Sequence, residues 1–292
     1  MSVQDPSEPP LAPALAGPHR PFAIGMRPLA TGEWIVPGAD LAGVLAEKAR
    51  LFAGRLGEVF AAEAASGAAQ AELWRLLAAH LTAHFPAVWR REGAAVEGPG
   101  VRAGDAGEAP LLAAARLVAD DLVLMMASPA GWRLAAGAVC FPSHWRLADK
   151  AGLAFADVHA PVPGFGPGSA GAGQVATIFD RMPPGRVAGR GNWSVAGTGA
   201  LHLPPGTAED DSVWLRAERQ TLRKLPETGA VVFTIGVTTL PAGALAMRAD
   251  GAGVAARLLA QLAAMRPEER AYKGLTGARL ARVRAVLAGV AG

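Results

Sequence analysis

The sequence has 292 residues, a formal net charge of +3 and hydrophobic residues at 51% of its positions. This apolar fraction is enough for the buried core of one large domain and too high for a disordered chain. No run of Lys and Arg gathers the positive charge in one place, so the charge pattern does not favour a nucleic-acid partner. The single cysteine excludes an internal disulfide, a cysteine-based zinc site and an iron–sulfur cluster within the chain.

The N-terminal sequence and the hydropathy pattern favour a cytoplasmic protein. Residues 1–20 are rich in proline and lack the basic start and apolar block of a signal peptide, so we expect a flexible tail there. No uncharged apolar run of about 18 residues follows, which argues against a membrane span. We expect the remaining residues, 21–292, to form a single α+β domain.

The first part of the chain is predicted to be helical. Residues 22–37 carry aromatic and aliphatic side chains and are expected to form an arm on the domain. The apolar spacing then predicts helices over 39–65 and 68–84. His80 and His84 share one face of the second helix, a spacing that suits a metal ion, although two histidines without a third ligand more often line a helix.

The middle of the chain is expected to contain a hairpin. The composition of residues 92–109 predicts a loop, and 111–119 has helical spacing. Apolar runs over 122–126 and 132–141, joined by a Ser-Pro-Ala-Gly turn, predict two antiparallel strands. Ser143 is then expected to cap a short helix that ends at Gly152.

The segment from His159 to Gly164 reads His-Ala-Pro-Val-Pro-Gly. Its two prolines fix φ and remove amide donors, which predicts a stiff, extended backbone after the histidine. A histidine beside such a turn suits a metal ligand, and it equally suits a hydrogen bond to its own loop. The residue pattern alone favours the second interpretation.

The C-terminal half combines two predicted strands with terminal helices. After a glycine-rich loop, a helix is expected over 175–182, and strands over 213–221 and 230–239. Charged side chains fall on both faces of the first strand, as expected at a sheet margin or beside a polar pocket. The last helix has a basic face, most simply solvated, with contact to an acidic partner protein as the alternative.

Several strings occur together in a recognisable order. They are Cys140-Phe141-Pro142-Ser143-His144-Trp145, His159-Ala160-Pro161-Val162-Pro163-Gly164, Asn192-Trp193-Ser194, Glu218-Arg219-Gln220-Thr221-Leu222-Arg223-Lys224-Leu225-Pro226 and Tyr272-Lys273-Gly274-Leu275. In this order, over about residues 20–276, the chain resembles the heme-dependent oxidative N-demethylase family, also called dimethylamine monooxygenase-like.

The resemblance implies a fold, a cofactor and a reaction. The fold would be a PAS-like antiparallel sheet flanked by helices, with N- and C-terminal helical segments and residues 242–290 packed on the domain. It would enclose a b-type heme, whose iron supports a monooxygenase reaction. A small secondary amine such as dimethylamine would become a primary amine and formaldehyde, with electrons from a separate flavin and iron–sulfur reductase. The oligomeric state is left open.

The resemblance also suggests roles for individual residues. His159 is the expected axial ligand of the heme iron, ahead of Cys140, which lies in a predicted strand. The remaining cofactor-binding candidates are Arg190, Arg219 and Arg223, as partners of the heme propionates, and Trp193. The catalytic candidates are Glu218, which would hold the amine or relay protons, and Asn192. The structural alternatives are an Arg–Glu pair that anchors the sheet and a tryptophan buried in the core.

A second function from another class fits the same cofactor. PAS-like domains often sense, so a heme-binding sensor or gas-binding module without catalysis is the alternative. A scaffold without cofactor is a third interpretation, and it leaves Glu218 and Arg219 without a task.

Overall fold

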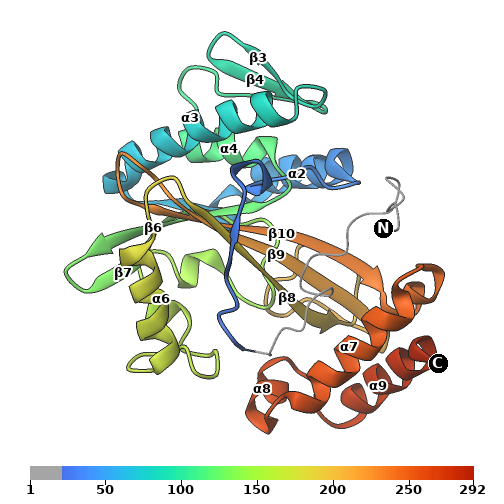
Figure 1. Cartoon of the computed structure of the whole chain (residues 1–292). Helices are drawn as coiled ribbons and strands as arrows, with labels where there is room; N and C mark the ends of the chain where they lie inside the picture. Colours follow the sequence, from blue (N-terminus) through green and yellow to red (C-terminus); the bar gives the residue numbers. More distant parts are fainter. Residues whose placement is uncertain (1–21) are drawn as a thin grey trace.

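The computed structural model describes residues 22–292, so the expected tail over residues 1–20 lies outside the described residues. Its centre is a seven-stranded antiparallel sheet in the order β1-β8-β9-β10-β6-β7-β2 (Figure 1). The strands are β1 (Arg27–Leu29), β2 (Phe60–Ala62), β6 (Asp121–Ser128), β7 (Gly131–Ala138), β8 (Val187–Ala196), β9 (Trp214–Lys224) and β10 (Val231–Pro241). With helices around this sheet, the predicted α+β class is confirmed.

Helices pack on both faces of the sheet. Alternate strand residues point to opposite faces, and Leu124 packs in one apolar cluster while its neighbour Met125 packs in another. The first cluster lies under α2 (Leu41–Val59), α3 (Gly67–His84) and α4 (Pro110–Leu117). The second lies under α5 (Phe155–Val158) and α6 (Ala170–Arg181). The site described below is on this second face.

The C-terminal helices pack against the far ends of β8 and β9. They are α7 (Gly251–Ala264), α8 (Pro267–Tyr272) and α9 (Gly277–Ala291). A third apolar cluster joins Trp193 and Val195 of β8, and Leu215 of β9, to α7 and α9. Figure 1 shows these helices in orange and red, away from α2, α3 and α4. The turn between α8 and α9 is thereby held beside β8.

Most predicted elements are found, with shifted ends. The helix expected over 39–65 ends at Val59, and Phe60–Ala62 become the edge strand β2, paired with Ala136–Ala138. The hairpin of β6 and β7 and the strands β9 and β10 are confirmed. Short 3-10 turns complete the chain: η1 (Thr31–Glu33), η2 (Ala64–Ser66), η3 (Leu147–Asp149) and η4 (Ala242–Met247).

A predicted loop and a predicted helix cap were wrong. The expected loop over 92–109 forms part of a small second sheet, β3 (Arg90–Glu92), β4 (Ala95–Gly98) and β5 (Val101–Ala103), because Gly93 and Gly100 supply the positive φ that tight turns need. Ser143 does not cap a helix. It bridges to Leu203, and only the turn η3 follows.

No helix within residues 22–292 combines the length and the apolar character needed to cross a membrane.

Candidate functional site

His159 follows the last turn of α5 and is anchored by its own helix. Its ring nitrogen Nδ1 lies 2.9 Å from the carbonyl oxygen of Phe155, which also accepts the backbone N–H of His159 at 3.1 Å. The imidazole stacks on the phenyl ring of Phe155, with centroids 4.1 Å apart and planes inclined by 28°. The ring is therefore fixed both in position and in tilt.

The Pro-Val-Pro segment holds this end of α5 by turns. The N–H of Val162 donates to the carbonyl of His159 at 2.8 Å, and the N–H of Phe165 donates to that of Val162 at 3.0 Å. In the second turn, Pro163 precedes Gly164, whose φ of 82° is the one that glycine tolerates at this position. The predicted stiffness thus arises from consecutive turns, and the predicted extended backbone was wrong.

The anchoring bond settles which nitrogen of His159 can bind a ligand. A carbonyl only accepts hydrogen bonds, so Nδ1 carries the hydrogen and Nε2 keeps its lone pair. Within residues 22–292, Nε2 has no hydrogen-bond partner. Burial, with smaller effects from the charges of Lys150 and Arg190, lowers the pKa of His159 to about 4, so the ring is neutral at pH 7. This is the tautomer and charge state of a metal-binding imidazole.

Strands β8 and β9 bring three polar candidates together on the face that packs on α5. Their register pairs Arg190 with Gln220 and Asn192 with Glu218, and paired residues share a face. Asn192 Nδ2 donates to Glu218 Oε2 at 3.0 Å, and Gln220 Nε2 donates to the same oxygen at 2.7 Å. Ala188, two residues before Arg190, packs against the same apolar cluster as Phe155, and the charge of Arg190 acts on the pKa of His159, so this row and His159 lie on the same side of the sheet.

Arg190 is a half-buried cation whose charge acts on the histidine. One terminal nitrogen, Nη1, donates to the carbonyls of Ala23 and Ile24, at 3.0 and 3.1 Å. Its Nε is buried without a partner in the described chain. Burial lowers the pKa of the guanidinium and the carboxylate of Glu218 opposes this. An incompletely satisfied buried guanidinium is a good partner for an anionic group.

The other two predicted arginines project from the opposite face of β9. Arg219 donates through Nη1 to the carbonyl of Trp34 at 3.0 Å, and through Nη2 to that of Glu33. The guanidinium of Arg223 lies over the ring of Trp34, 4.3 Å from its centroid. Both therefore hold the segment before α2, and the predicted grouping of all three arginines with His159 is corrected.

Trp193 also faces away from His159. It is 3% exposed, packs in the cluster of α7 and α9, and donates its indole N–H to Gln261 at 2.7 Å. Its neighbour Asn192 points to the opposite side because side chains alternate along a strand. The surroundings of Trp193 match the structural alternative, a tryptophan buried in the core.

Sequence reasoning did not assign a role to Gln220 or Lys273. Gln220 stands two residues after Glu218 on the same strand face, so the alternation alone could have indicated it. Lys273 comes from the turn between α8 and α9, and its Nζ donates to the carbonyl of Trp193 and, at 3.4 Å, to Oδ1 of Asn192. No local signal in the sequence brings it there.

The cluster that includes Phe155 is apolar and partly open. In the cluster under α5 and α6, about half of the members are only partly buried. The partly buried members include Ile24, Met26, Phe155, Phe165, Ala188 and Phe233. Apolar side chains that keep some exposure, in a cluster that includes the residue on which His159 stacks, form a suitable surface for a flat apolar group.

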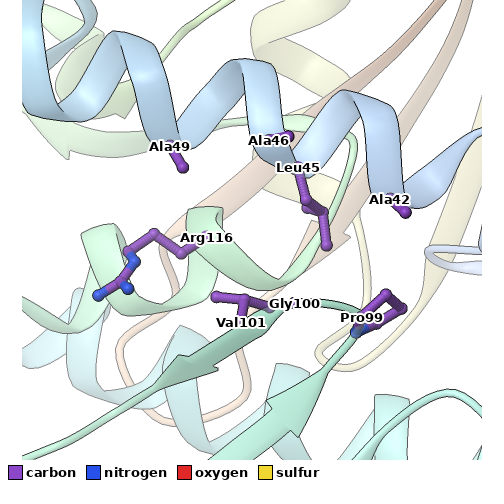
Figure 2. Close-up of a pocket in the computed structure, with 8 residues that line it drawn as sticks. All are labelled: Ala42, Leu45, Ala46, Ala49, Pro99, Gly100, Val101 and Arg116. Carbon is purple, nitrogen blue, oxygen red and sulfur yellow. The ribbon is translucent and has the colours of Figure 1, made fainter.

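Two cavities lie elsewhere. One of about 240 Å³ separates α2 from the turn between β4 and β5, with Arg116 of α4 at its edge (Figure 2). Another, of about 480 Å³, lies beside Gly197 and Trp214. Neither cavity is lined by His159, Arg190 or Glu218. The candidate site is therefore identified from the chemistry of its side chains and not from a cavity.

The alternative ligands are less suitable. Cys140 is fully buried, and burial raises the pKa of its thiol to about 12, which disfavours a thiolate. His80 hydrogen-bonds the carbonyl of Ile35 at 2.7 Å, and its ring lies 4.9 Å from that of His84. In the described residues, no group of three or more His, Cys, Asp or Glu side chains is placed to hold a metal ion.

The chain was compared with known proteins. No curated protein matches it. A family model described as "Haem-dependent oxidative N-demethylase, alpha subunit-like" matches residues 25–281, a range that contains the anchored His159 and the polar row on β8 and β9. Because this match covers most of the chain, the protein belongs to that family.

Proposed function

We propose that this protein is a heme-dependent monooxygenase that removes a methyl group from a small secondary amine. The products would be a primary amine and formaldehyde, with dimethylamine as the model substrate. The observation that carries the proposal is the hydrogen bond from His159 Nδ1 to the carbonyl of Phe155, which leaves Nε2 without a partner in the described chain.

The residues around His159 fit a heme. The neutral imidazole of His159 offers one lone pair that would bind the heme iron. The partly open apolar cluster suits the faces of a porphyrin, and the buried Nε of Arg190 suits a propionate. The five long strands lie in the order β7-β6-β10-β9-β8. The first of them in the sequence, β6, therefore pairs with the last, β10, at the centre of the sheet. This order supports the expected PAS-like sheet.

When bound, the heme would supply the iron at which oxygen is reduced and the amine oxidised. The electrons would come from a separate flavin and iron–sulfur reductase, because one cysteine cannot hold a cluster in this chain. The description of the matching family as alpha subunit-like is in keeping with a partner protein.

Glu218 would bind the substrate in its ammonium form. Asn192 and Gln220 both donate to its Oε2, while Oε1 has no hydrogen-bond partner among residues 22–292. Two donors fix the carboxylate plane and leave one oxygen for the N–H of an alkylammonium. Oε2 is thus held by the protein, while Oε1 can accept a hydrogen bond from the substrate or take up its proton.

The test is an absorption and product assay on the full-length protein. We expect it to bind hemin with a Soret band that shifts when dimethylamine is added, and to release formaldehyde when supplied with oxygen and electrons. A heme spectrum that is unmoved by amines, with no formaldehyde, would favour the sensor alternative. Colourless protein that takes up no hemin would contradict both.

A further inference from the structure

Lys273 lies at the junction between the C-terminal helices and the polar row of β8. Its Nζ donates to the carbonyl of Trp193 and to Oδ1 of Asn192, the latter at 3.4 Å. The aromatic rings of Phe22 and Trp193 flank the ammonium, 5.4 and 5.8 Å away. Since Asn192 donates through Nδ2 to Glu218 at 3.0 Å, one amide connects the lysine to the carboxylate.

The charges that act on Lys273 come from both neighbouring strands. Burial lowers the pKa of Lys273 to about 8, while Glu218 on β9 raises it and Arg190 on β8 lowers it. The adjacent Tyr272 has a raised pKa, chiefly because of burial, so its phenol stays neutral in this range. Lys273 is therefore protonated at neutral pH and loses its proton in mildly basic solution.

An ammonium can only donate hydrogen bonds, and this fixes the amide of Asn192. The carbonyl oxygen Oδ1 must face Lys273, so the NH2 group must face Glu218. The carboxylate of Glu218 can only accept, so it favours the same orientation of the amide from the other side. A neutral amine or an apolar side chain at residue 273 leaves the amide held by Glu218 alone, and its position is then less firmly fixed.

We propose that Lys273 is a positioning residue of the amine site, whose ammonium holds Oδ1 of the Asn192 amide and thereby helps to keep an N–H donor on Glu218. The link to the amine rests on the proposed function. The orientation of Asn192 does not, because it concerns only side chains of this chain.

Asn192 is the only asparagine in the sequence, so its amide gives a single reporter of the contact with Lys273. Full-length protein labelled with a nitrogen isotope only in the asparagine side chain gives a single NH2 signal pair by NMR. Between about pH 6.5 and 9.5 this pair is expected to shift with a midpoint set by Lys273, near the pH at which its ammonium titrates. The titration needs no substitution, so it stands even if a variant fails to fold.

Three variants identify the group responsible. In Lys273→Met the signal pair should be displaced from the wild-type position and stay constant over this range. In Lys273→Arg, whose side chain remains a donor at every pH, the signal pair should stay over the whole range near the position that the wild type shows at low pH, and no midpoint should be seen. Lys224→Met is the matched control, because Lys224 also donates to two carbonyls, those of Phe179 and Asp180, and lies 5.8 Å from the ring of Trp132.

The control should keep the wild-type midpoint. A signal pair that ignores pH in the wild type, or that keeps its midpoint in Lys273→Met, would overturn the proposal. Loss of the midpoint in Lys224→Met would do the same.

In an active preparation, Lys273→Met should raise KM for the amine about tenfold, the effect of one hydrogen bond to a charged group, and Lys273→Arg should restore it. Failure of the assay in all proteins alongside the expected NMR result would contradict only the proposed function.

Discussion

His159 makes two contacts with the same residue, Phe155, one helical turn earlier: its Nδ1 hydrogen-bonds the carbonyl oxygen, and its ring stacks on the phenyl ring. The carbonyl fixes the tautomer and the phenyl ring fixes the tilt, so Nε2 points along one direction without help from a distant segment. A pre-oriented ligand avoids much of the entropy that a mobile histidine loses when it binds a metal. The short helix α5 is thereby the element on which the proposed site depends.

The two faces of the sheet at β8 and β9 predict different outcomes for Arg190 and Arg219. Arg190→Met should weaken hemin binding about tenfold, because a charge-assisted hydrogen bond to a propionate is lost. Arg219→Met should leave hemin affinity unchanged and lower the free energy of unfolding by about 1–3 kcal/mol, because Arg219 holds the carbonyls of Glu33 and Trp34. Hemin titration and denaturant unfolding of both variants measure the two effects. Equal losses of hemin affinity would contradict the assignment of faces.

Glu218 is expected to act on the amine more than on the heme. Glu218→Gln keeps the size of the side chain but removes its charge, so binding of a secondary ammonium should weaken about tenfold or more. The heme spectrum without amine should stay close to that of the wild type. An amine titration followed by the Soret band checks this, and an unchanged amine affinity would remove Glu218 from the substrate site.

Asp121 should give the fold a pH dependence. It is fully buried, accepts the N–H groups of Cys140 and Phe141 at 2.8 Å each, and burial raises its pKa from 3.8 to about 6. Between these values the folded state binds more protons than the unfolded state, so this contribution to stability is present below pH 3.8 and is lost as pH rises through 6. The loss amounts to about 3 kcal/mol at most.

Comparison with Asp121→Asn isolates this effect. The amide cannot ionise, so the difference in unfolding free energy between wild type and variant should change between about pH 4 and 7. Asp211→Asn, at an exposed carboxylate paired with Arg282, is the control and should show no comparable change. Parallel pH profiles of wild type and Asp121→Asn would show that Asp121 does not titrate in this range.

The sequence predicted elements well where side chains repeat with a clear period. The hairpin of β6 and β7, the strands β9 and β10 and the helix α3 all lie close to their predicted ranges. It failed where a strand is short, as in β3 to β5, because three or four residues are too few to show alternation. It also failed at Ser143, where pairing with Leu203 replaces the expected helix cap.

The sequence predicted only part of the candidate site, because motifs do not show which face of a strand a side chain occupies or which distant segments meet. His159, Arg190, Asn192 and Glu218 are found on one side of the sheet, as grouped from their motifs. Arg219, Arg223 and Trp193 come from the same motifs, but adjacent strand residues point to opposite faces. Lys273 reaches Asn192 across 81 positions, through the packing of α7 and α9 on the sheet, and no local pattern encodes such a contact.

The most direct test of His159 as the heme ligand is the heme spectrum of His159→Ala beside that of His202→Ala. His202 is a matched control, because its Nδ1 also bonds a backbone carbonyl, that of Cys140 at 2.7 Å, while its Nε2 is engaged by Arg55 at 3.1 Å. Removal of His159 should abolish or strongly shift the Soret band, and removal of His202 should leave it in place. A band unchanged in His159→Ala, or lost equally in His202→Ala, would contradict His159 as the axial ligand.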